Sequence, residues 1–589
     1  MRSVTKLHER WFYLPGDTPS GCPPRFRDAA WQEVKLPHTP EEGFPDRYWY
    51  CKAAHIERME GERVYLRVDS PAANCRVFAD GREVERLRAG MTHTVELTSH
   101  HRRTRPLQIA FRFKGEKDGT IGGFPRGLSL YVVPRSHFAF DAKGAWGVSV
   151  QPEILENGSA KVKASAVVML PEEEQKISFA IGGPNVSVPA TVPAAEFAIP
   201  RPRFWMPMDP FLYSLRAILS GQDRTHLDTV DVPFGVREFK LKPEGLLWNG
   251  MLVPTRGVIR ETPPPGGGLS RERELALLGE LGADTLLLTG TPEEDAFFDT
   301  CDKVGLRVLQ SVSALGSFKK REDGLNAAKK LVFRLINHPC VAGWVMPVAG
   351  EDENSVRALC ELIRNADPGR PIILTGCEPD IIYNWGDFPA DAAALNIDFK
   401  DKAALKTLDK LRAEKPSLPL ALVQEDNAAD ERLAGALLER PWLIAFGTAR
   451  LYAGDKDGAL LSKKNEPEDG YYLLRSLWTI IRSEESGERS QDEVKEGGEE
   501  AKEGKPDSAP PPAMFKPFVH ICAFDRENPK RVVVYSNAGE VALTVNGQEL
   551  AAQKGQGIFV FDGVVLNDGA NQALAKAGEA THARALNNN

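Results

Sequence analysis

The sequence predicts a multidomain protein of β and α/β type, in which β-sandwich units flank a (β/α)8 barrel. The chain has 589 residues, which is too long for a single hydrophobic core. Its first third and its end carry short, partly alternating runs of β-branched and aromatic residues, as antiparallel sheets do. From about residue 234 onward, apolar runs alternate with helical patterns over about 250 residues, which favours a parallel sheet closed into a barrel.

The composition excludes several classes of partner. The net charge is -8, and no run of Lys and Arg is interleaved with aromatic residues, so we expect no nucleic acid partner. No apolar run approaches the roughly 20 residues of a membrane span, so we expect no membrane partner. The first residues lack the apolar segment of a secretion signal, which makes the cytoplasm the expected compartment unless the sequence has been trimmed.

Cysteines and metal-binding residue types give no sign of a metal centre. The eight cysteines are scattered without a Cys-x-x-Cys spacing, which is typical of buried, reduced thiols. His, Asp and Glu form no cluster with metal-ligand spacing. The sequence therefore predicts no metal and no cofactor.

Two β-rich domains are expected in the first part of the chain, at residues 1–136 and 137–233. The second has about a hundred residues, the usual size of an immunoglobulin-like sandwich. The strand candidates are Val64–Val68, Arg76–Ala79, Leu107–Phe113, Ala160–Met169 and Lys176–Ile181.

The barrel is expected over residues 234–483. Its strand candidates are Thr285–Thr289, Leu306–Leu309, Val341–Val345, Pro371–Leu374 and Leu420–Val423, with helices at Ser270–Leu281 and Ser355–Ala366. An open, doubly wound sheet is the alternative. No G-x-G-x-x-G or G-x-x-x-x-G-K-[ST] loop follows any of these strands, so nucleotide chemistry has no support.

A charged, Gly- and Pro-rich segment at 484–515 separates the barrel from the end of the chain. It has almost no large apolar side chains, so it predicts a disordered linker. Beyond it, Arg531–Ser536 and Val541–Val545 read as strands, and Asn546-Gly547 as a turn. These predict one more small β-domain at residues 516–580.

Local motifs in this layout point to a known family. They are Trp31 to Thr39 with Tyr48-Trp49-Tyr50, Phe234 to Phe239 with Trp248-Asn249-Gly250 and Arg256-Gly257-Val258, Phe298 to Val308, Arg334 to Pro339, Asp457-Gly458 with Tyr471 to Trp478, and Val534 to Gly547. With them, the chain resembles family 2 glycoside hydrolases, the β-galactosidase and β-glucuronidase group. The resemblance implies a jelly-roll, sugar-binding-like domain at 1–136, a catalytic-type barrel, an immunoglobulin-like C-terminal domain and a β-linked glycoside as ligand.

The resemblance also implies two catalytic carboxyl groups, which retaining glycosidases hold about 5–5.5 Å apart. It places the acid/base five residues after Trp344, where this sequence has Ala349. Glu351 replaces it only if the loop carries a two-residue insertion. Asp352 and Glu353 beside it indicate a solvated acidic loop equally well.

The family nucleophile corresponds to Glu425, after the seventh strand; the alternative is a rim carboxylate left over from an ancestral site. Other family positions are altered, because Leu287 and Gly290 stand where an Arg and a His are expected. The resemblance also implies a Tyr after Asn396, which follows the sixth strand, and this sequence has no Tyr there. The strand-eight Trp-Asp stretch is replaced by Ala445 to Arg450.

Three further residues are candidates for contact with a sugar: Trp385, Asn396 and Glu261. Trp385 either stacks on a sugar ring or only covers the barrel rim. Arg260 and Glu261 either line the pocket or form an ion pair at its rim. His338 is expected to be structural, because its Asn-His-Pro turn precedes its strand and lies away from the catalytic face.

These observations favour a carbohydrate-engaging family 2 scaffold whose retaining β-glycosidase activity is lost or much reduced. One alternative is an active exo-β-glycosidase with Glu425 as nucleophile and Glu351 as displaced acid. Another is a structural subunit of a larger assembly, and a homo-oligomer stays open.

Overall fold

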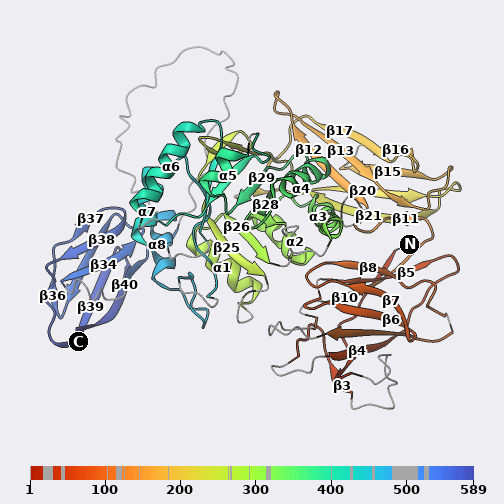
Figure 1. Ribbon diagram of the computed structural model, residues 1–589, viewed down its shortest axis with the longest axis horizontal. Helices are drawn as coiled ribbons and strands as arrows, with labels where there is room; N and C mark the ends of the chain where they lie inside the picture. Colours follow the sequence, from red (N-terminus) through yellow and green to blue (C-terminus); the bar gives the residue numbers. More distant parts are fainter. Residues whose placement is uncertain are drawn as a thin grey trace, which may run out of the picture.

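A computed structural model gives the arrangement of the chain (Figure 1). It describes residues 2–17, 31–40, 47–69, 71–102, 104–114, 123–124, 127–142, 144, 146–182, 185–207, 209–262, 264, 268–290, 292–312, 320–385, 387–398, 401–424, 429–453, 458–479, 515–522 and 530–588. In Figure 1 the N-terminal sandwich lies at the lower right, a second sandwich lies above it, the barrel occupies the middle and the C-terminal β-domain lies at the left.

The N-terminal sandwich consists of two antiparallel sheets. One has the order β1-β10-β5-β8 and the other β3-β2-β4-β9-β6-β7. Their strands are β1 (Ser3–Lys6), β2 (Trp11–Pro15), β3 (Gln32–Val34), β4 (Arg47–Ala54), β5 (Arg63–Val68), β6 (Cys75–Ala79), β7 (Arg82–Leu87), β8 (His93–Glu96), β9 (Leu107–Lys114) and β10 (Leu128–Val133).

Strand β9 shows how the sequence separates the two faces of the larger sheet. Because side chains alternate along a strand, Phe111 and Phe113 point into the core between the two sheets, where both are fully buried. Arg112 and Lys114 point to the opposite face. That outer face therefore carries charge close to the barrel.

The second sandwich packs a three-stranded sheet, β12-β13-β17, on a four-stranded sheet, β16-β15-β20-β21. Its elements, with two short flanking pairs, are β11 (His137–Phe138), β12 (Val148–Ile154), β13 (Ala160–Ala166), β14 (Val168–Met169), β15 (Lys176–Ile181), β16 (Asn185–Pro189), β17 (Ala194–Ile199), β18 (Trp205–Met206), β19 (Asp209–Pro210), β20 (Tyr213–Ser220) and β21 (His226–Phe234). The three strands β22 (Phe239–Lys242), β23 (Gly245–Trp248) and β24 (Met251–Val253) then lead into the barrel.

Eight parallel strands follow in chain order, which confirms the predicted barrel in place of an open sheet. They are β25 (Gly257–Thr262), β26 (Thr285–Gly290), β27 (Arg307–Ser311), β28 (Val341–Pro347), β29 (Ile372–Thr375), β30 (Ala392–Leu395), β31 (Leu420–Val423) and β32 (Ile444–Gly447). The cylinder closes because the amides of Thr448 and Leu451 donate to Gly257 and Ile259 of β25, at 2.9 and 2.8 Å.

The helices pack around this cylinder in the order that strand–helix alternation predicts. They are α1 (Arg271–Leu281), α2 (Asp295–Val304), α3 (Arg321–Leu335), α4 (Glu353–Ala366), α5 (Pro379–Asn384), α6 (Lys402–Glu414), α7 (Glu431–Glu439) and α8 (Asp469–Trp478). Helix α1 begins where the sequence suggests, because the Ser270 side chain accepts from the amide of Arg273.

The C-terminal β-domain has a sheet of order β33-β34-β38 and another of order β36-β35-β39-β40. Its strands are β33 (Val519–Ile521), β34 (Arg531–Ser536), β35 (Glu540–Val545), β36 (Gln548–Glu549), β37 (Gln553–Lys554), β38 (Gly557–Asp562), β39 (Gly569–Ala577) and β40 (Ala580–Asn588). It contacts helix α8 through His520, whose Nε2 lies 2.8 Å from Asp469 Oδ1. The predicted linker lies outside the described residues except for residue 515, and the domain boundaries stay predictions.

Two further features of the described chain bear on the sequence analysis. Seven cysteines are buried free thiols, and the eighth, Cys22, lies outside the described residues. None of the helices in the described ranges is both long and apolar enough to cross a membrane.

Candidate functional site

A cavity of about 230 Å³ opens at the carboxyl end of the barrel, where strands β25 and β26 meet the segment after β32. We call it the mouth cavity; its lining is Ile259, Glu261, Thr289, Gly290, Arg450 and Tyr452. Ile259 and Glu261 alternate along β25 and both line the cavity, so they share the inner face of the strand. The mouth cavity combines a carboxylate, a guanidinium and two hydroxyl groups.

The sequence anticipated Glu261 as a sugar contact, and its exposed side chain lines the mouth cavity. Arg260, its neighbour, points the other way and is buried. Its Nε lies 2.8 Å from Glu274 Oε1, and its Nη1 lies 2.7 Å from Glu293 Oε1. Arg260 is thus paired with one carboxylate of helix α1 and one from the segment before α2, whereas Glu261 lines the cavity.

Tyr452 connects the mouth cavity with these buried ion pairs, because its hydroxyl hydrogen-bonds to Glu274. Burial, followed by the charge of Glu274, raises the pKa of Tyr452 well above its usual range. The phenol is therefore neutral and donates to the carboxylate. The sequence does not predict Tyr452 or Arg450 as site residues. Both follow β32, and they reach the cavity only because the barrel closes there on β25.

The region expected to hold the acid/base lies just after β28. Ala349 is exposed there, and its methyl carbon is 3.8 Å from the position that a Cβ on Gly376 would occupy. Glu351 is half-buried, and its amide donates to the carbonyl of Val348 at 3.0 Å. The loop thus turns back on the end of β28 before helix α4 begins.

The other two acids of this loop serve helix α4. Asp352 caps it, with its carboxylate 3.0 Å from the amide and 2.6 Å from the hydroxyl of Ser355. Glu353 is paired with Arg357 one turn along the helix, at 2.6 Å. These contacts account for Asp352 and Glu353 as helix-starting residues.

The predicted nucleophile, Glu425, lies outside the described residues. Its predecessor Gln424 is buried directly after β31, and its Nε2 donates to the carbonyl of Ile397 at 2.7 Å. Ile397 follows Asn396, which is exposed just after β30. Gln424 therefore ties the ends of two neighbouring barrel strands together, on the same side of the barrel as Glu261.

Trp385 is not brought to this group of residues. Helix α5 separates it from the end of β29, and Trp385 is the C-cap of that helix, with its backbone amide donating to the carbonyl of Ile381 at 3.0 Å. Two residues earlier, the ring of Tyr383 lies 5.8 Å from Nζ of Lys415, which precedes β31. Trp385 is half-buried against the core of the barrel and is not among the described residues that line the mouth cavity.

His338 pairs with Asp302 before β28, on the side of the barrel away from the mouth, as its position in the sequence suggested. The two are 2.7 Å apart, and Asp302 also accepts from the amide of Cys340 at 2.9 Å. Asp299 lies close enough for the three side chains to share a cation. Because Asp302 is already used by His338 and Cys340, these contacts account for the pair as a structural element.

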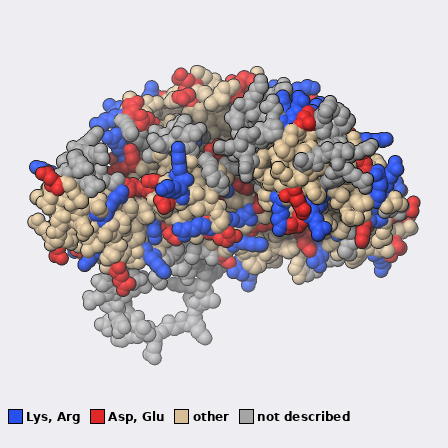
Figure 2. Space-filling model, turned by 90° about the horizontal axis from the view of Figure 1, so that it is seen from below, with Lys and Arg blue, Asp and Glu red and all other residues tan. Residues whose placement is uncertain are grey.

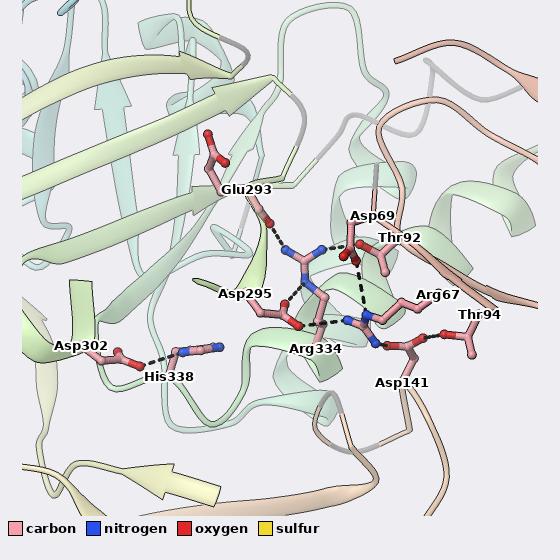
Figure 3. A network of polar contacts seen from close by, with 10 residues as sticks. All are labelled: Arg67, Asp69, Thr92, Thr94, Asp141, Glu293, Asp295, Asp302, Arg334 and His338. Carbon is pink, nitrogen blue, oxygen red and sulfur yellow. Dashed lines mark hydrogen bonds and ion pairs between the residues drawn. The ribbon is translucent and has the colours of Figure 1, made fainter. Parts of the chain in front are cut away.

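A buried ionic network joins the N-terminal sandwich to the barrel (Figure 3). Arg67 of β5 is 2% exposed and lies 3.1 Å from both Asp141 and Asp295. Asp295 also faces Arg334 of α3, at 3.2 Å. Burial lowers the pKa of Arg67, but the surrounding carboxylates outweigh it and raise that pKa above its usual value. The network fixes the sandwich against helices α2 and α3.

A second, larger cavity of about 1130 Å³ lies between the N-terminal sandwich and the barrel mouth. We call it the cationic cavity; its charged lining is Arg47, Arg76, Arg86, Arg88, Arg112 and Lys114, and its barrel side is Thr262, Gly290 and Pro292. It contains no acidic side chain among the described lining residues. Gly290 borders both cavities, so the two adjoin at the end of β26.

Comparison with known proteins identifies the layout. Residues 137–237 match the family model described as Glycosyl hydrolases family 2. A β-galactosidase of Thermoanaerobacter pseudethanolicus is 22% identical over 427 residues, covering 63% of this chain and 55% of that protein. A β-glucuronidase of Bacteroides fragilis is 24% identical over 374 residues, covering 55% of this chain and 53% of that protein. The chain spans about half the length of the curated relatives it matches.

Solved structures share the whole fold. A putative β-galactosidase from Bacteroides fragilis superimposes with a TM-score of 0.77 at 18% identity, covering 99% of this chain and 98% of the other. A β-glucuronidase from Bacteroides uniformis gives a TM-score of 0.77 at 17% identity, covering 100% of this chain and 80% of the other. At these identities the likeness establishes the architecture alone.

Proposed function

Because the chain belongs to glycosyl hydrolases family 2, we propose that it binds a β-linked glycoside at the barrel mouth with lost or much reduced hydrolytic activity. The mouth cavity supports binding. Its volume of about 230 Å³ lies below the roughly 300–1,000 Å³ of drug-sized pockets, which suits one small ring. Glu261 can accept hydrogen bonds from sugar hydroxyl groups, and Arg450 can donate to them.

The observation that carries the reduced activity is Ala349. It lies exposed at the end of the fourth barrel strand, where the family resemblance expects the acid/base. A methyl group cannot protonate a leaving oxygen, and general acid catalysis contributes about 10²–10⁴-fold in rate. Substrate can therefore be held while bond cleavage is slow.

One alternative has its own support, because Glu351 lies two residues after Ala349 in the same turn. Asp352 and Glu353 make their contacts with helix α4, whereas Glu351 precedes that helix and is half-buried in the turn after β28. As a displaced acid it would make the protein an active exo-β-glycosidase. Catalytic groups must sit within about 0.5 Å of the productive position, which makes such a replacement demanding.

The test compares hydrolysis and binding of the same ligands. We would measure nitrophenyl β-galactoside and β-glucuronide hydrolysis by the wild type, A349E and the matched amide variant A349Q. We expect slow hydrolysis by the wild type. Because a positioned acid supplies about 10²–10⁴-fold in rate, the hydrolysis rate should rise at least roughly tenfold in A349E and should not rise in A349Q. Calorimetry should show glycoside binding by the wild type and weaker binding by E261Q.

Two results would contradict the reduced activity. Rapid hydrolysis by the wild type that is abolished in E351Q would establish the displaced acid. Labelling of Glu425 by a fluorinated mechanism-based sugar, with ordinary turnover, would establish an intact retaining site. Absence of any saccharide binding would instead leave the structural-subunit alternative.

A further inference from the structure

We propose that the cationic cavity binds the anionic part of an oligosaccharide whose terminal ring occupies the mouth cavity. The ligand class is a saccharide that carries carboxylate or sulfate groups along its chain. This inference rests on the proposed function, because it extends the same ligand beyond the barrel. The cationic cavity, at about 1130 Å³, exceeds the roughly 300–1,000 Å³ of drug-sized sites and has room for several rings.

The first argument is a ladder of arginines on the outer face of the larger N-terminal sheet. Arg112 of β9 lies directly opposite Arg76 of β6, and Arg76 lies directly opposite Arg86 of β7. Two residues along β9, Lys114 lies opposite Arg47 of β4. Like charges directly opposite one another destabilise a sheet, so folding alone does not favour this arrangement.

The second argument is that, among the described residues, the carboxylates that pair with the cavity's cations are fewer than those cations. Asp17 pairs with Arg47 and Arg112, and Glu83 lies 3.2 Å from Arg76 and 2.7 Å from Arg86. Asp323 pairs with Arg88. Six lining cations thus face three carboxylates in the part of the chain that the structure describes. Among the described residues of this cavity, cations therefore outnumber carboxylates.

The third argument is accessibility. The side chains of Arg76 and Arg86 are 42% and 70% exposed, so they can reach a ligand. In Figure 2 basic side chains, with acidic ones among them, are visible at the surface on the right, the side of the two sandwiches. A guanidinium offers a planar pair of donors that matches a carboxylate or sulfate, and a cleft lined by one sign of charge focuses its field.

The location favours a saccharide over other polyanions. Thr262 and Gly290, at the ends of the first two barrel strands, form one wall of the cationic cavity, and Gly290 also lines the mouth cavity. A chain that leaves the mouth cavity on this side enters the cationic cavity directly. The net negative charge of the protein disfavours a long phosphate backbone, which needs a broad basic surface.

The experiment uses the full chain and four probes of similar length: an oligogalacturonide, a sulfated galactan oligosaccharide, a neutral cello-oligosaccharide and a single-stranded oligonucleotide. Calorimetry at low and moderate salt would compare the wild type, R76Q/R86Q and K114Q. The matched control is R203Q/R216Q, which removes two exposed arginines from the second sandwich, each paired with one aspartate.

We expect at least one anionic saccharide to bind more tightly than the neutral probe and to weaken with salt. The double variant R76Q/R86Q should lose about tenfold or more in affinity, and K114Q less, because charge-assisted hydrogen bonds are lost. The control should stay within about twofold. The uronate and sulfate probes distinguish the two sources of negative charge.

Three results would overturn this inference, and each can be distinguished from failure of the proposed function. If the nitrophenyl glycosides bind and E261Q weakens them, but R76Q/R86Q leaves the anionic saccharides unaffected, the cationic cavity is not their site. Tighter binding of the oligonucleotide than of every saccharide, lost in the same variants, would assign the cavity to nucleic acid and overturn the inference. If R76Q/R86Q fails to fold, equal affinity of K114Q and the wild type at low salt overturns it.

Discussion

Arg67 of the N-terminal sandwich and Asp295 of the barrel form a buried ion pair across the domain interface, with Nη2 and Oδ2 3.1 Å apart and the two residues 228 positions apart in sequence. Asp295 begins helix α2, where a negative charge also complements the helix dipole. On its other side it faces the buried Arg334. One carboxylate therefore serves two buried guanidinium groups from different parts of the chain.

The variant D295N should destabilise the protein by about 3 kcal/mol, the lower end of the range for a broken buried ion pair. The loss stays at that end because Asp69 and Asp141 still face Arg67. Equilibrium unfolding in urea, followed by tryptophan fluorescence, would measure it. D231N, which breaks the exposed Arg216 pair, should change stability by less than about 1 kcal/mol. Equal effects of the two variants would show that the Arg67 network does not hold the interface.

The pair of His338 and Asp302 predicts a dependence of stability on pH. Burial lowers the pKa of His338, but the charge of Asp302 and the hydrogen bond to it raise that pKa further, so the net shift is upward. Because the pKa of the histidine is higher in the folded than in the unfolded protein, its protonation stabilises the fold fully below the unfolded pKa of about 6.5. This contribution is lost as the pH rises through the pKa of the folded protein. The gap in thermal midpoint between the wild type and H338Q should therefore narrow from pH 6 to pH 9. H226Q, at an exposed histidine, is the control; a gap that widens over the same range would contradict the assignment.

The barrel could be read from the sequence because its strands are apolar runs that are buried on both sides. The candidates Thr285–Thr289 and Leu420–Val423 correspond to β26 and β31 within one residue. The sequence alone predicts that Trp385 lies on a loop after the fifth strand. The short helix α5, which begins with Pro379, lies between them, and Trp385 is its C-cap.

The arginine ladder and the ion pairs between domains could not be predicted from the sequence in the same way. Arg112 is visible as a charged residue in an alternating strand, but its opposition to Arg76 depends on how two distant strands pair. Arg67 and Asp295 likewise meet only through the docking of two domains. Sequence patterns report which face a residue occupies, whereas pairing between distant strands is set by the register of the whole sheet.

Gly257 at the start of β25 is required for barrel closure. A Cβ there would lie 1.9 Å from the carbonyl oxygen of Phe446, which is backbone and cannot move without breaking the contact between the first and last strands. G257A should therefore give little soluble protein, or a loss of more than about 3 kcal/mol of the kind that overpacking and broken hydrogen bonds produce. G435A, inside helix α7 with nothing within 4 Å, should be neutral or stabilising by up to about 1 kcal/mol. Soluble yield and thermal midpoints would compare the two, and a G257A midpoint equal to that of the wild type would contradict the closure argument.

Gly290 predicts a test of whether the two cavities act together. Its φ is +79°, and a Cβ would lie 2.3 Å from the carbonyl oxygen of Thr262, so G290A must shift the wall that both cavities share. Gly250 also has a φ of +79° but has nothing within 4 Å, so G250A carries the backbone strain of about 1–2 kcal/mol without the contact. Calorimetry should show G290A weakening both the small neutral glycoside and the anionic oligosaccharide, while R76Q/R86Q weakens only the latter. If G290A affected one ligand alone, the two cavities would be separate sites, because a shared wall cannot move without changing both.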